Sequence, residues 1–485
     1  MEYNIVNREK EIQELEARYN SNKPEFVAIY GRRRVGKTFL INSVFENRFT
    51  FKHSGLSPIS NTKKSSSSKL KNQLIHFYNS LLSNGLVNEK CPTSWLEAFY
   101  LLEKLLEQKE DANKMVVFLD EIQWMDTPKS DFITGLESFW NSWVSYSHNV
   151  LLIVCGSSTS WVLDKLINNH GGLYGRLTKW INLKQFNLYE CEKYIKSLNI
   201  EMSRYDITLA YMTLGGIPYY LEKLKREYSL AQNLNRLFFA KDAELKDEFD
   251  RLFSSIFTNH ETIQRIVKAI NTKKRGLTRN EIISLCNLKS SGDLSMMLKA
   301  LENGGFVMKY ASFGESKRET YYKLVDPFCL FYLNFVDEKN NNNDSYWSNN
   351  IDSQKTIVWK GLAFENACFN HIKQIKNKLG ISGVTTNESV WSKKGNDDEY
   401  GTQIDLIIER KDNVTNMCEI KFYNDEVFID KNYHFILERR KRLILDNSSK
   451  KTIVHNVLIT TFGIQKKEYW GDFTQVITLD DLFTN

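Results

Sequence analysis

A glycine-rich octapeptide near the N-terminus carries residue types suited to binding phosphate. Gly31–Thr38 reads GRRRVGKT, which fits the spacing G-x-x-x-x-G-K-[ST]. In such a loop, successive backbone N–H groups and the positive end of the following helix face the β- and γ-phosphates of a nucleotide. Lys37 adds a mobile positive charge between those phosphates, and the hydroxyl of Thr38 is a ligand for Mg²⁺. The pattern predicts a nucleoside triphosphate site that uses Mg²⁺.

The segments on either side of this loop have the periodicity that phosphate binding requires. Glu25–Tyr30 (EFVAIY) is a short apolar run rich in β-formers, and Thr38–Phe45 (TFLINSVF) has a helical pattern. A strand, a tight turn and a helix start in this order distinguish the site from a basic surface turn with two accidental glycines. We therefore expect the nucleotide to be bound by Gly31, Val35, Gly36, Lys37, Thr38 and Phe39.

An acidic pair follows the next strongly apolar run. Met115–Leu119 (MVVFL) is continuous enough to be a parallel strand buried on both faces, and Asp120 and Glu121 follow it directly. In this arrangement, known as a Walker B motif, Asp120 belongs to the Mg²⁺ shell and Glu121 orients and deprotonates the attacking water. Two structural acids at a strand end are the alternative.

Three further positions suit contacts with the nucleotide, and each has a plainer alternative. Ser157 follows the apolar run Val150–Cys155, where its hydroxyl can reach the γ-phosphate or the water, or can cap a helix. Arg176, in the glycine-rich turn GGLYGRLT, can supply charge to a γ-phosphate in its own chain or in a neighbouring subunit, or is a surface arginine. Pro218, after two glycines, contacts the adenine or only ends a helix–helix turn.

The pattern of apolar segments divides the chain. Strands that alternate with helices predict an open α/β sheet with right-handed crossovers over residues 1–185. Residues 186–260 have a helical pattern without a strand-like run, as in a helical lid. Residues 261–340 have three helices and two short strands, Phe306–Tyr310 and Thr320–Leu324, which predict a winged helix-turn-helix. Its middle helix starts at Thr278, with Glu281 at capping-box spacing.

Basic residues of the predicted winged helix can meet a polyanion. Lys299 and the wing segment Ser316, Lys317 and Arg318 are positioned to contact phosphates, although a winged helix is as often a protein-interaction module. The 65 basic residues exceed the 59 acidic ones, which gives a net charge of +6. This mild excess permits a nucleic-acid partner, with DNA as the preferred expectation, without requiring one.

Residues 350–485, after a linker at Asn340–Asp344, form a second α/β pattern with its own acidic constellation. We expect a helix at Trp359–Lys376 and strands at Ile404–Ile408, Met417–Phe422, Val457–Thr461 and Val476–Leu479. Glu365 lies on the helix and Asp405 on the first strand, and Glu419 and Lys421 share one face of the second strand.

These acids have the chemistry of a metal site. Carboxylates from Glu365, Asp405 and Glu419 can hold one or two Mg²⁺ ions, and Lys421 can stabilise charge on a phosphorane-like transition state or position water. A surface ion pair on an edge strand is the alternative for Glu419 and Lys421. The basic run Glu438–Arg442 suits phosphate contacts near such a site, or a solvated helix face.

Several of these segments resemble a known family. IVNREKEI, GRRRVGKT, VVFLDE, GGLYGR and GGIPYYL, in this order, look like the archaeal-type ATPase family of the AAA+/STAND P-loop proteins. The resemblance implies that Arg8 and Glu9 flank an ATP molecule, that Pro218 contacts it, and that a winged helix follows. The family usually has glycine where this chain has Asn7, a residue that tolerates a left-handed backbone better than other side chains do.

The C-terminal order of a helix acid, a strand Asp and E-x-K resembles the PD-(D/E)xK nuclease superfamily, and such a domain closes many proteins of this ATPase family. The expected fold class is therefore α/β: a P-loop NTPase parallel sheet, a helical lid, a winged helix and a C-terminal domain like a restriction endonuclease. The resemblance covers roughly the first 330 residues for the ATPase part.

Three functions fit these observations. The first is an ATP-gated enzyme that cuts nucleic acid, for which a role in defence against invading DNA is compatible but not indicated by any residue. The second is an ATP-driven switch or DNA-binding regulator with an inactive nuclease fold, and the third is a protein-remodelling ATPase. If Arg176 acts on a neighbouring subunit a homo-oligomer is required; if it acts within its own chain a monomer suffices.

The composition of the chain also indicates its cellular location. Seven scattered cysteines without zinc-like spacing favour a reducing compartment. No apolar run approaches the roughly 18 residues of a membrane span, and the N-terminus lacks a signal-peptide pattern. We expect a cytoplasmic protein without a membrane partner.

Overall fold

The chain forms two compact units in the computed structural model. The structure describes residues 5–57, 66–111, 113–147, 149–257, 259–313, 320–337, 343–393 and 402–485. The first unit comprises Met1–Gln185 and Asp250–His260, and the second comprises Phe186–Phe249 and Glu261–Asn485.

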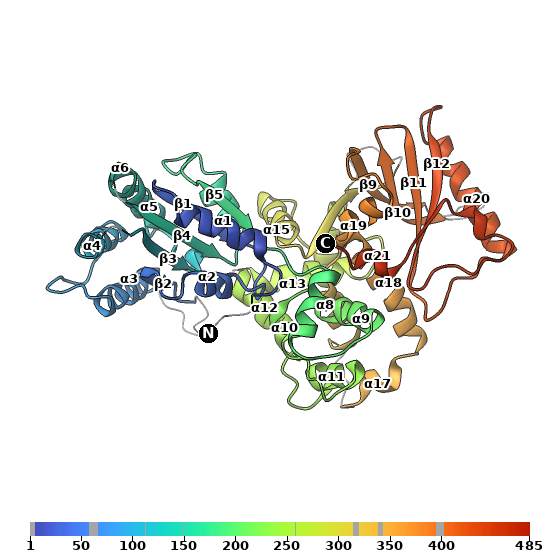
Figure 1. Cartoon of the computed structure of the whole chain (residues 1–485), viewed down its shortest axis with the longest axis horizontal. Coiled ribbons are helices and arrows are strands. Elements are labelled where there is room, and N and C mark those ends of the chain that lie inside the picture. Colours follow the sequence, from blue (N-terminus) through green and yellow to red (C-terminus); the bar gives the residue numbers. More distant parts are fainter. Residues whose placement is uncertain are drawn as a thin grey trace. The chain divides into compact units, whose positions relative to one another are not determined.

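The first unit is built on a five-stranded parallel sheet in the order β2-β3-β4-β1-β5 (Figure 1). Its strands are β1 (Glu25–Tyr30), β2 (Phe49–Ser54), β3 (Met115–Asp120), β4 (Val150–Gly156) and β5 (Lys179–Asn182). Every residue of β1, β3 and β4 is buried, as expected for parallel strands covered on both faces. This order places β4 between the strand that leads into the glycine loop and the strand that ends in the acids.

Helices and an aromatic core cover this sheet. Trp95 and Phe132 pack edge to face with their ring centroids 4.9 Å apart, and Phe77 packs against Trp95 at 5.4 Å. The helical segments are α1 (Glu9–Tyr19), α2 (Lys37–Phe45), α3 (Ser66–Ser83), α4 (Trp95–Gln108), η1 (Ile122–Trp124), α5 (Phe132–Ser138), η2 (Phe139–Val144), α6 (Ser145–Ser147), α7 (Thr159–Val162) and η3 (Leu163–Ile167).

The second unit begins with helices only, as the sequence predicts. These are α8 (Leu188–Ser197), α9 (Arg204–Leu214), α10 (Pro218–Leu221), α11 (Leu230–Leu234) and η4 (Asn235–Phe239). The next helix, α12 (Glu248–Ile256), starts in this unit and continues into the first. Asn187 and Glu190 form a capping box that fixes the start of α8.

Three helices and a small antiparallel sheet follow in the predicted order. They are α13 (His260–Ile270), β6 (Leu277–Thr278), α14 (Arg279–Cys286), α15 (Gly292–Asn303), β7 (Val307–Ala311) and β8 (Thr320–Leu324), with strand order β6-β8-β7. The predicted capping box is present, because Thr278 caps the backbone N–H of Glu281 and the Glu281 carboxylate accepts from the N–H of Thr278 at 2.8 Å. Ser316, Lys317 and Arg318 lie outside the described residues.

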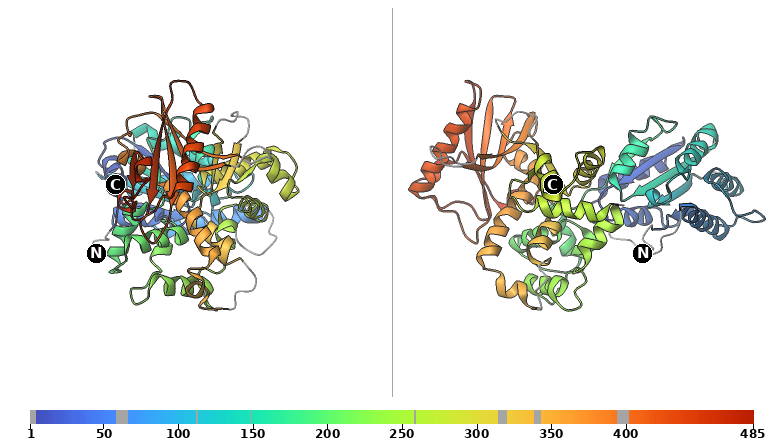
Figure 2. Two further views of the ribbon diagram at one scale, coloured as in Figure 1. Left: turned by 90° about the vertical axis from the view of Figure 1, so that its right-hand side faces the viewer. Right: turned by 180° about the vertical axis from the view of Figure 1, so that it is seen from behind.

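A mixed five-stranded sheet, in orange to red in Figure 2, completes the second unit. Its strand order is β13-β12-β11-β10-β9. Strands β9 to β11 are antiparallel neighbours, whereas β11, β12 and β13 are parallel. Its elements are α16 (Pro327–Phe335), α17 (Tyr346–Asn350), α18 (Gln354–Asn370), α19 (Ile372–Lys378), β9 (Thr386–Lys393), β10 (Thr402–Arg410), β11 (Val414–Lys421), α20 (Lys431–Asp446), β12 (Ile453–Thr460), η5 (Trp470–Asp472), β13 (Gln475–Ile477) and α21 (Leu479–Leu482).

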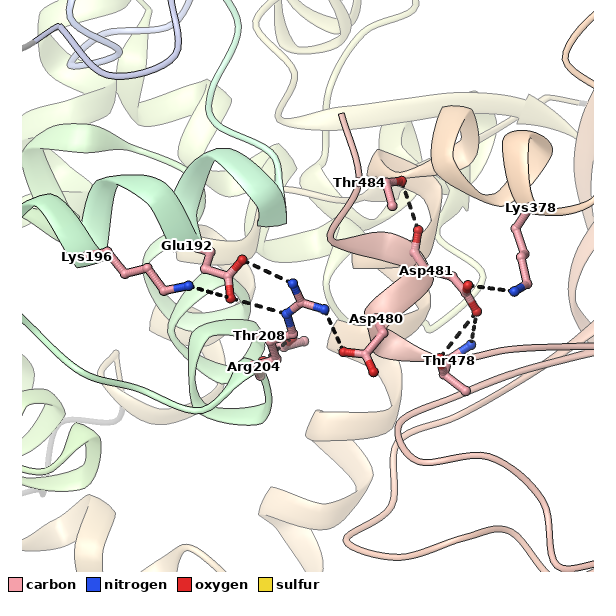
Figure 3. A network of polar contacts seen from close by, with 9 residues as sticks. All are labelled: Glu192, Lys196, Arg204, Thr208, Lys378, Thr478, Asp480, Asp481 and Thr484. Atoms are coloured by element: carbon pink, nitrogen blue, oxygen red, sulfur yellow. Dashed lines mark hydrogen bonds and ion pairs between the residues drawn. The ribbon is translucent and has the colours of Figure 1, made fainter.

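Within the second unit, α9 joins the helical segment to the C-terminal sheet. Figure 3 shows Arg204 between Glu192 of α8 and Asp480 of α21, with guanidinium–carboxylate distances of 3.2 and 2.7 Å. The next residue, Tyr205, stacks on Phe422 with ring centroids 4.9 Å apart. The start of α9 therefore contacts the end of β11. Among the described helices, none has the length and apolarity needed to cross a bilayer.

Candidate functional site

The glycine loop occupies the turn between β1 and α2. Gly31 has φ +144°, and a Cβ there would lie 2.2 Å from the carbonyl oxygen of Leu183, so the close backbone approach excludes other residues. Gly36 has φ +92° at the N-terminal end of α2. Lys37 folds back over the loop, where its ammonium donates hydrogen bonds to the carbonyls of Gly31 at 3.0 Å and Arg32 at 2.9 Å. The loop thus has the conformation that the motif predicts, with its lysine held by backbone oxygens.

A hydrogen bond connects the loop to the acidic strand end. The Thr38 hydroxyl donates to Oδ2 of Asp120 at 2.8 Å. Asp120 is 6% exposed, and burial, followed by the charge of Glu121, raises the pKa of its carboxyl. A hydroxyl and a buried, electrostatically unfavourable carboxylate fit Mg²⁺ as ligands, because a cation would relieve the cost of the buried charge.

Glu121 lies in a strained turn directly after β3. Its backbone is left-handed, with φ 46° and ψ 47°, which is costly for a residue with a side chain. Its Oε2 accepts hydrogen bonds from the hydroxyl of Ser157 at 2.7 Å and from the amide of Gln123 at 2.6 Å. The sequence predicted Glu121 and Ser157 as site residues but missed Gln123.

The alternative assignment is a helix cap from the run at residues 157–160, and α7 does begin within this run, after Ser158 rather than Ser157. Ser158 precedes α7, and its side chain makes no capping hydrogen bond. The hydroxyl of Ser157 instead bonds to Glu121, while its predicted contact with the γ-phosphate stays a prediction.

The N-terminal residues lie beside the loop through the chain that follows β5. Arg8 is buried and donates from its guanidinium to the carbonyl of Lys184 at 2.8 Å, next to Leu183, which contacts Gly31. Asn7 has φ 60°, so it adopts the left-handed backbone proposed for the position usually held by glycine. Glu9 is the exposed first residue of α1.

The remaining predicted nucleotide contacts are less constrained. Phe39 is 50% exposed on α2, and Val35 is buried in the loop. Arg176 is exposed in the turn before β5 and makes no ion pair with any described residue, so both its cis and its trans role stay predictions. Pro218 starts α10 in the second unit, and its contact with the adenine likewise stays a prediction.

The second of the two glycines before Pro218, Gly216, has a packing role of its own. A Cβ on Gly216 would lie 1.8 Å from the carbonyl oxygen of Phe186, and the N–H of Phe186 donates to the carbonyl of Gly216 at 2.7 Å. This backbone contact supports the plainer alternative, a turn that packs against the chain entering α8.

The C-terminal constellation brings Glu419 and Lys421 together on β11. The ammonium of Lys421 lies 2.7 Å from Oε1 of Glu419, and the other carboxylate oxygen pairs with Arg440 of α20. The hydroxyl of Tyr433 also donates to Glu419, which is 3% exposed. The basic run on α20 therefore reaches the site through Arg440, and the sequence had not identified Tyr433.

Asp405 lies on the adjacent strand, close to the same carboxylate. Its Oδ2 accepts from the backbone N–H of Ile420 at 3.2 Å. Burial, followed by the charges of Glu419 and Glu365, raises the pKa of Asp405 to about 8. The carboxylate of Glu365 on α18 is 3.5 Å from the ammonium of Lys323, a β8 residue that sequence reasoning missed.

The three acids do not form a complete ligand set in this conformation. Within the described residues, no three or more His, Cys, Asp or Glu side chains are placed to hold a metal ion. The residue types fit Mg²⁺, since buried carboxylates with raised pKa values gain from a nearby cation. A metal bound at Glu419 would replace contacts that Lys421 and Arg440 now make.

Comparisons with known proteins match parts of the chain. Residues 5–224 match a family described as an ATPase domain predominantly from Archaea. An uncharacterized protein of Methanocaldococcus jannaschii is 27% identical over 337 residues, which cover 68% of this chain and 69% of the relative. An uncharacterized ATP-binding protein of the same organism is 51% identical over 44 residues, which cover 9% of this chain and 75% of the relative.

Solved structures with a similar arrangement include the Walker-type ATPase of Pyrococcus abyssi, with a TM-score of 0.45, 20% identity, and coverage of 68% of this chain and 96% of that one. The ORC2 protein of Aeropyrum pernix, in its ADPNP–ADP complexes, has a TM-score of 0.41 and 13% identity. The match covers 67% of this chain and 92% of the ORC2 chain. The matched family segment, residues 5–224, contains the glycine loop, the acidic strand end and the Gly-Gly-Ile-Pro turn. Residues 5–224 are therefore similar to the ATPase domains of this predominantly archaeal family.

Proposed function

We propose that this chain binds MgATP at Gly31–Thr38 and hydrolyses it with Glu121 as the base. The observation that carries the proposal is the 2.8 Å hydrogen bond between Thr38 and Asp120. It joins the phosphate-binding turn to the acidic strand end, so that both prospective Mg²⁺ ligands and the prospective base occupy one edge of the sheet.

The residues of the loop perform the binding part of this reaction. Backbone N–H groups at the start of α2 bind the phosphate oxygens, and Lys37 exchanges the carbonyls of Gly31 and Arg32 for the β- and γ-phosphates. Thr38 and Asp120 would hold a Mg²⁺ ion, which would supply positive charge to the phosphate oxygens. These contacts position the triphosphate before any bond changes.

Glu121 performs the proton transfer. Its carboxylate accepts a proton from water as the water oxygen bonds to the γ-phosphorus, and the bond from that phosphorus to the β–γ bridging oxygen breaks. ADP keeps the bridging oxygen and inorganic phosphate leaves with the water oxygen. Charge develops on the transferred group, where Lys37 stabilises it.

Replacing Lys37 tests the binding step. Lys37→Ala removes a charged contact worth roughly 2–3 kcal/mol, so we expect the Kd for MgATP to rise by about 30- to 150-fold. Calorimetric titration measures this, with Lys10→Ala, an exposed lysine on α1, as the matched control. If Lys37→Ala binds MgATP as tightly as Lys10→Ala does, the loop is not the nucleotide site.

We further propose that the C-terminal sheet carries a Mg²⁺-dependent nuclease-like site whose action on nucleic acid depends on the nucleotide state of the ATPase domain. The proposal is supported by the order α18, α19, β9, β10, β11, α20, β12, which fits a helical segment, an antiparallel three-strand meander, a helix and a parallel strand. It is also supported by the position of Asp405 beside Glu419 and Lys421. DNA is the preferred substrate class.

A polar cavity supports a nucleic-acid partner for the second unit. It has a volume of about 550 Å³, and the side chains that line it include Arg279, Lys299 and Lys309. Three cations around one hollow of the predicted winged helix suit phosphate groups.

A regulator with an inactive nuclease fold is the second candidate. It is favoured by the contacts of Glu419 with Lys421 and Arg440, which already neutralise a carboxylate that a metal would need. A protein-remodelling ATPase without nucleic acid is the third reading, and no contact among the described residues of the C-terminal sheet favours it.

Cleavage assays separate these candidates. Wild-type protein is incubated with plasmid DNA, single-stranded DNA and RNA in Mg²⁺, Mn²⁺ or EDTA, each with ATP, ADP or no nucleotide. We expect metal-dependent cleavage that Asp405→Asn and Lys421→Met abolish and that Lys411→Met, at an exposed lysine of the β10–β11 turn, retains. Absence of cleavage by the wild-type chain in every combination would favour the regulator.

A further inference from the structure

A closed set of hydrogen bonds holds the carboxylate of Glu121. Gln123 donates from its amide nitrogen to Oε2 of Glu121 at 2.6 Å and to the hydroxyl oxygen of Ser157 at 3.1 Å. Ser157 in turn donates to the same Oε2 at 2.7 Å. The three side chains form a triangle in which one carboxylate oxygen receives two hydrogen bonds. Within the described part of the chain, Oε1 of Glu121 has no hydrogen-bond partner.

Two glycines make room for this triangle. A Cβ on Gly156, the last residue of β4, would lie 2.8 Å from the side-chain oxygen of Gln123. A Cβ on Gly55, just after β2, would lie 2.8 Å from the carbonyl oxygen of Glu121. The turn after β3 therefore lies close to the ends of β2 and β4. The residues at the two points of contact are glycines, which leave room for the turn.

The triangle has a local cost that packing alone does not explain. Glu121 has a left-handed backbone, which is an unfavourable conformation for a residue with a side chain. The carbonyl oxygen of the Gln123 side chain is buried and has no hydrogen-bond partner among the described residues. Backbone strain and an unpaired buried acceptor beside one carboxylate indicate that this carboxylate is held for function.

The amide orientation of Gln123 follows from its neighbour. A glutamine presents either two N–H donors or an oxygen acceptor to a given partner, and only the N–H donors are attractive to an ionised carboxylate. The terminal torsion of a glutamate is broad, so a carboxylate without such donors rotates freely. The two donors on Oε2 fix the plane of the Glu121 carboxylate. Because the plane is fixed, the direction of the second oxygen, Oε1, is fixed as well.

We propose that Gln123 is a positioning residue for ATP hydrolysis: together with Ser157 it anchors Oε2 of Glu121, so that Oε1 is the oxygen that orients and deprotonates the attacking water. This inference rests on the proposed function of Glu121 as the base. Gln123 acts through Glu121 and touches neither the phosphates nor the water, so its loss changes the rate of hydrolysis and leaves nucleotide affinity unchanged.

A double-mutant cycle tests the inference. Gln123→Met keeps the length of the side chain and removes both donors, and the variant is made in the wild type and in Glu121→Gln. The measurements are single-turnover release of phosphate from MgATP and the Kd for MgATP. Gln108→Met, at an exposed glutamine in the last turn of α4, is the matched control.

We expect Gln123→Met to lower the hydrolysis rate by about 10- to 100-fold, as a misplaced catalytic group does, with a Kd within about twofold of the wild type. In Glu121→Gln the same substitution has no further effect. Gln123→Glu, which is nearly isosteric but places an acceptor against the carboxylate, gives a loss at least as large and serves if Gln123→Met does not fold.

Two results would overturn the inference while leaving the proposed function intact: a wild-type rate in Gln123→Met, or an equal further loss in Glu121→Gln. The second result would mean that Gln123 acts independently of Glu121. If instead Glu121→Gln itself hydrolyses MgATP at the wild-type rate, the proposed function fails, whatever Gln123 does.

Discussion

At the scale of single residues, the sequence predicts those site residues that belong to motifs of fixed spacing. In such motifs the spacing indicates which group each residue contacts. The spacing of the glycine loop identifies its lysine and threonine as phosphate and metal contacts. A buried strand that ends in two acids predicts one metal ligand and one catalytic base. The structure brings Thr38 to Asp120 and Glu121 to Ser157, although 82 and 36 positions separate the members of these pairs in sequence. Parallel strands bring these residues together at one edge of the sheet.

Gln123 could not be found in this way. Its side chain reaches Ser157 because the left-handed backbone of Glu121 turns the chain back toward β4, and no periodicity in the sequence reports that turn. A polar residue two positions after the acids, inside the apolar stretch IQWM, was the only signal.

The C-terminal constellation shows the same limit. The sequence identified Glu365, Asp405, Glu419 and Lys421, but the cations that neutralise two of these acids come from distant elements. Lys323 is on β8 and Arg440 on α20. Ion pairs of this kind depend on how separate elements pack, which spacing along one strand does not encode.

At the scale of elements, buried strands and capped helices were predictable. The edge strands β7 and β13 were also expected, whereas other edge strands were not. The continuous apolar runs of β1, β3 and β4 give strands at the expected positions. The sequence did not indicate β2, β5 or β9, all of which are short or mixed in polarity and lie at or near a sheet edge. Edge strands need no continuous apolar run, so their sequences resemble loops.

A buried histidine links two elements of the second unit. His371 Nε2 accepts from the N–H of Leu188, the first residue of α8, at 2.9 Å, and Nδ1 donates to the carbonyl of Ala367 at 2.6 Å. Burial lowers the pKa of His371 to about 4. The imidazole is therefore neutral in the folded chain, and its protonation would break the bond to α8.

This histidine predicts a dependence of stability on pH. The unfolded chain protonates His371 near pH 6.5, whereas the folded chain does so only near pH 4, so stability falls as the pH is lowered between these values. Hydrogen exchange at the start of α8 should accelerate from pH 7 to pH 5, after correction for the intrinsic rate. His371→Gln can still accept from Leu188 but cannot titrate, and we expect it to reduce this dependence. An unchanged dependence in that variant would assign the effect to other groups.

At the scale of the whole molecule, the chain passes between its two units three times. These crossings are at residues 185–186, 249–250 and 260–261, and the last two fall within α12 and α13. The glycine loop and its acids belong to the first unit, whereas Pro218 and the C-terminal acids belong to the second. The three connecting segments are the covalent links between the two units. For the nucleotide to affect the C-terminal site, its binding must change the relative free energies of two conformations of the chain.

The contacts of α9 indicate which residues would connect a change at the nucleotide to the C-terminal site. Tyr205, at the start of the helix, stacks on Phe422, the residue after Lys421, and its hydroxyl donates to Asn424 at 2.6 Å. The other end of α9 leads into the Gly-Gly-Ile-Pro turn that we expect to contact the nucleotide. One helix therefore lies between the predicted adenine contact and the strand that carries Lys421.

The central claim, that Glu121 hydrolyses ATP bound at the glycine loop, is tested most directly by turnover of MgATP in Glu121→Gln. The substitution keeps the shape of the side chain and removes its basicity. We expect MgATP to bind with the wild-type Kd and phosphate release to fall by about 100-fold or more, whereas Glu110→Gln, at an exposed residue after α4, keeps the wild-type rate. Wild-type turnover in Glu121→Gln would contradict the account and place the base elsewhere.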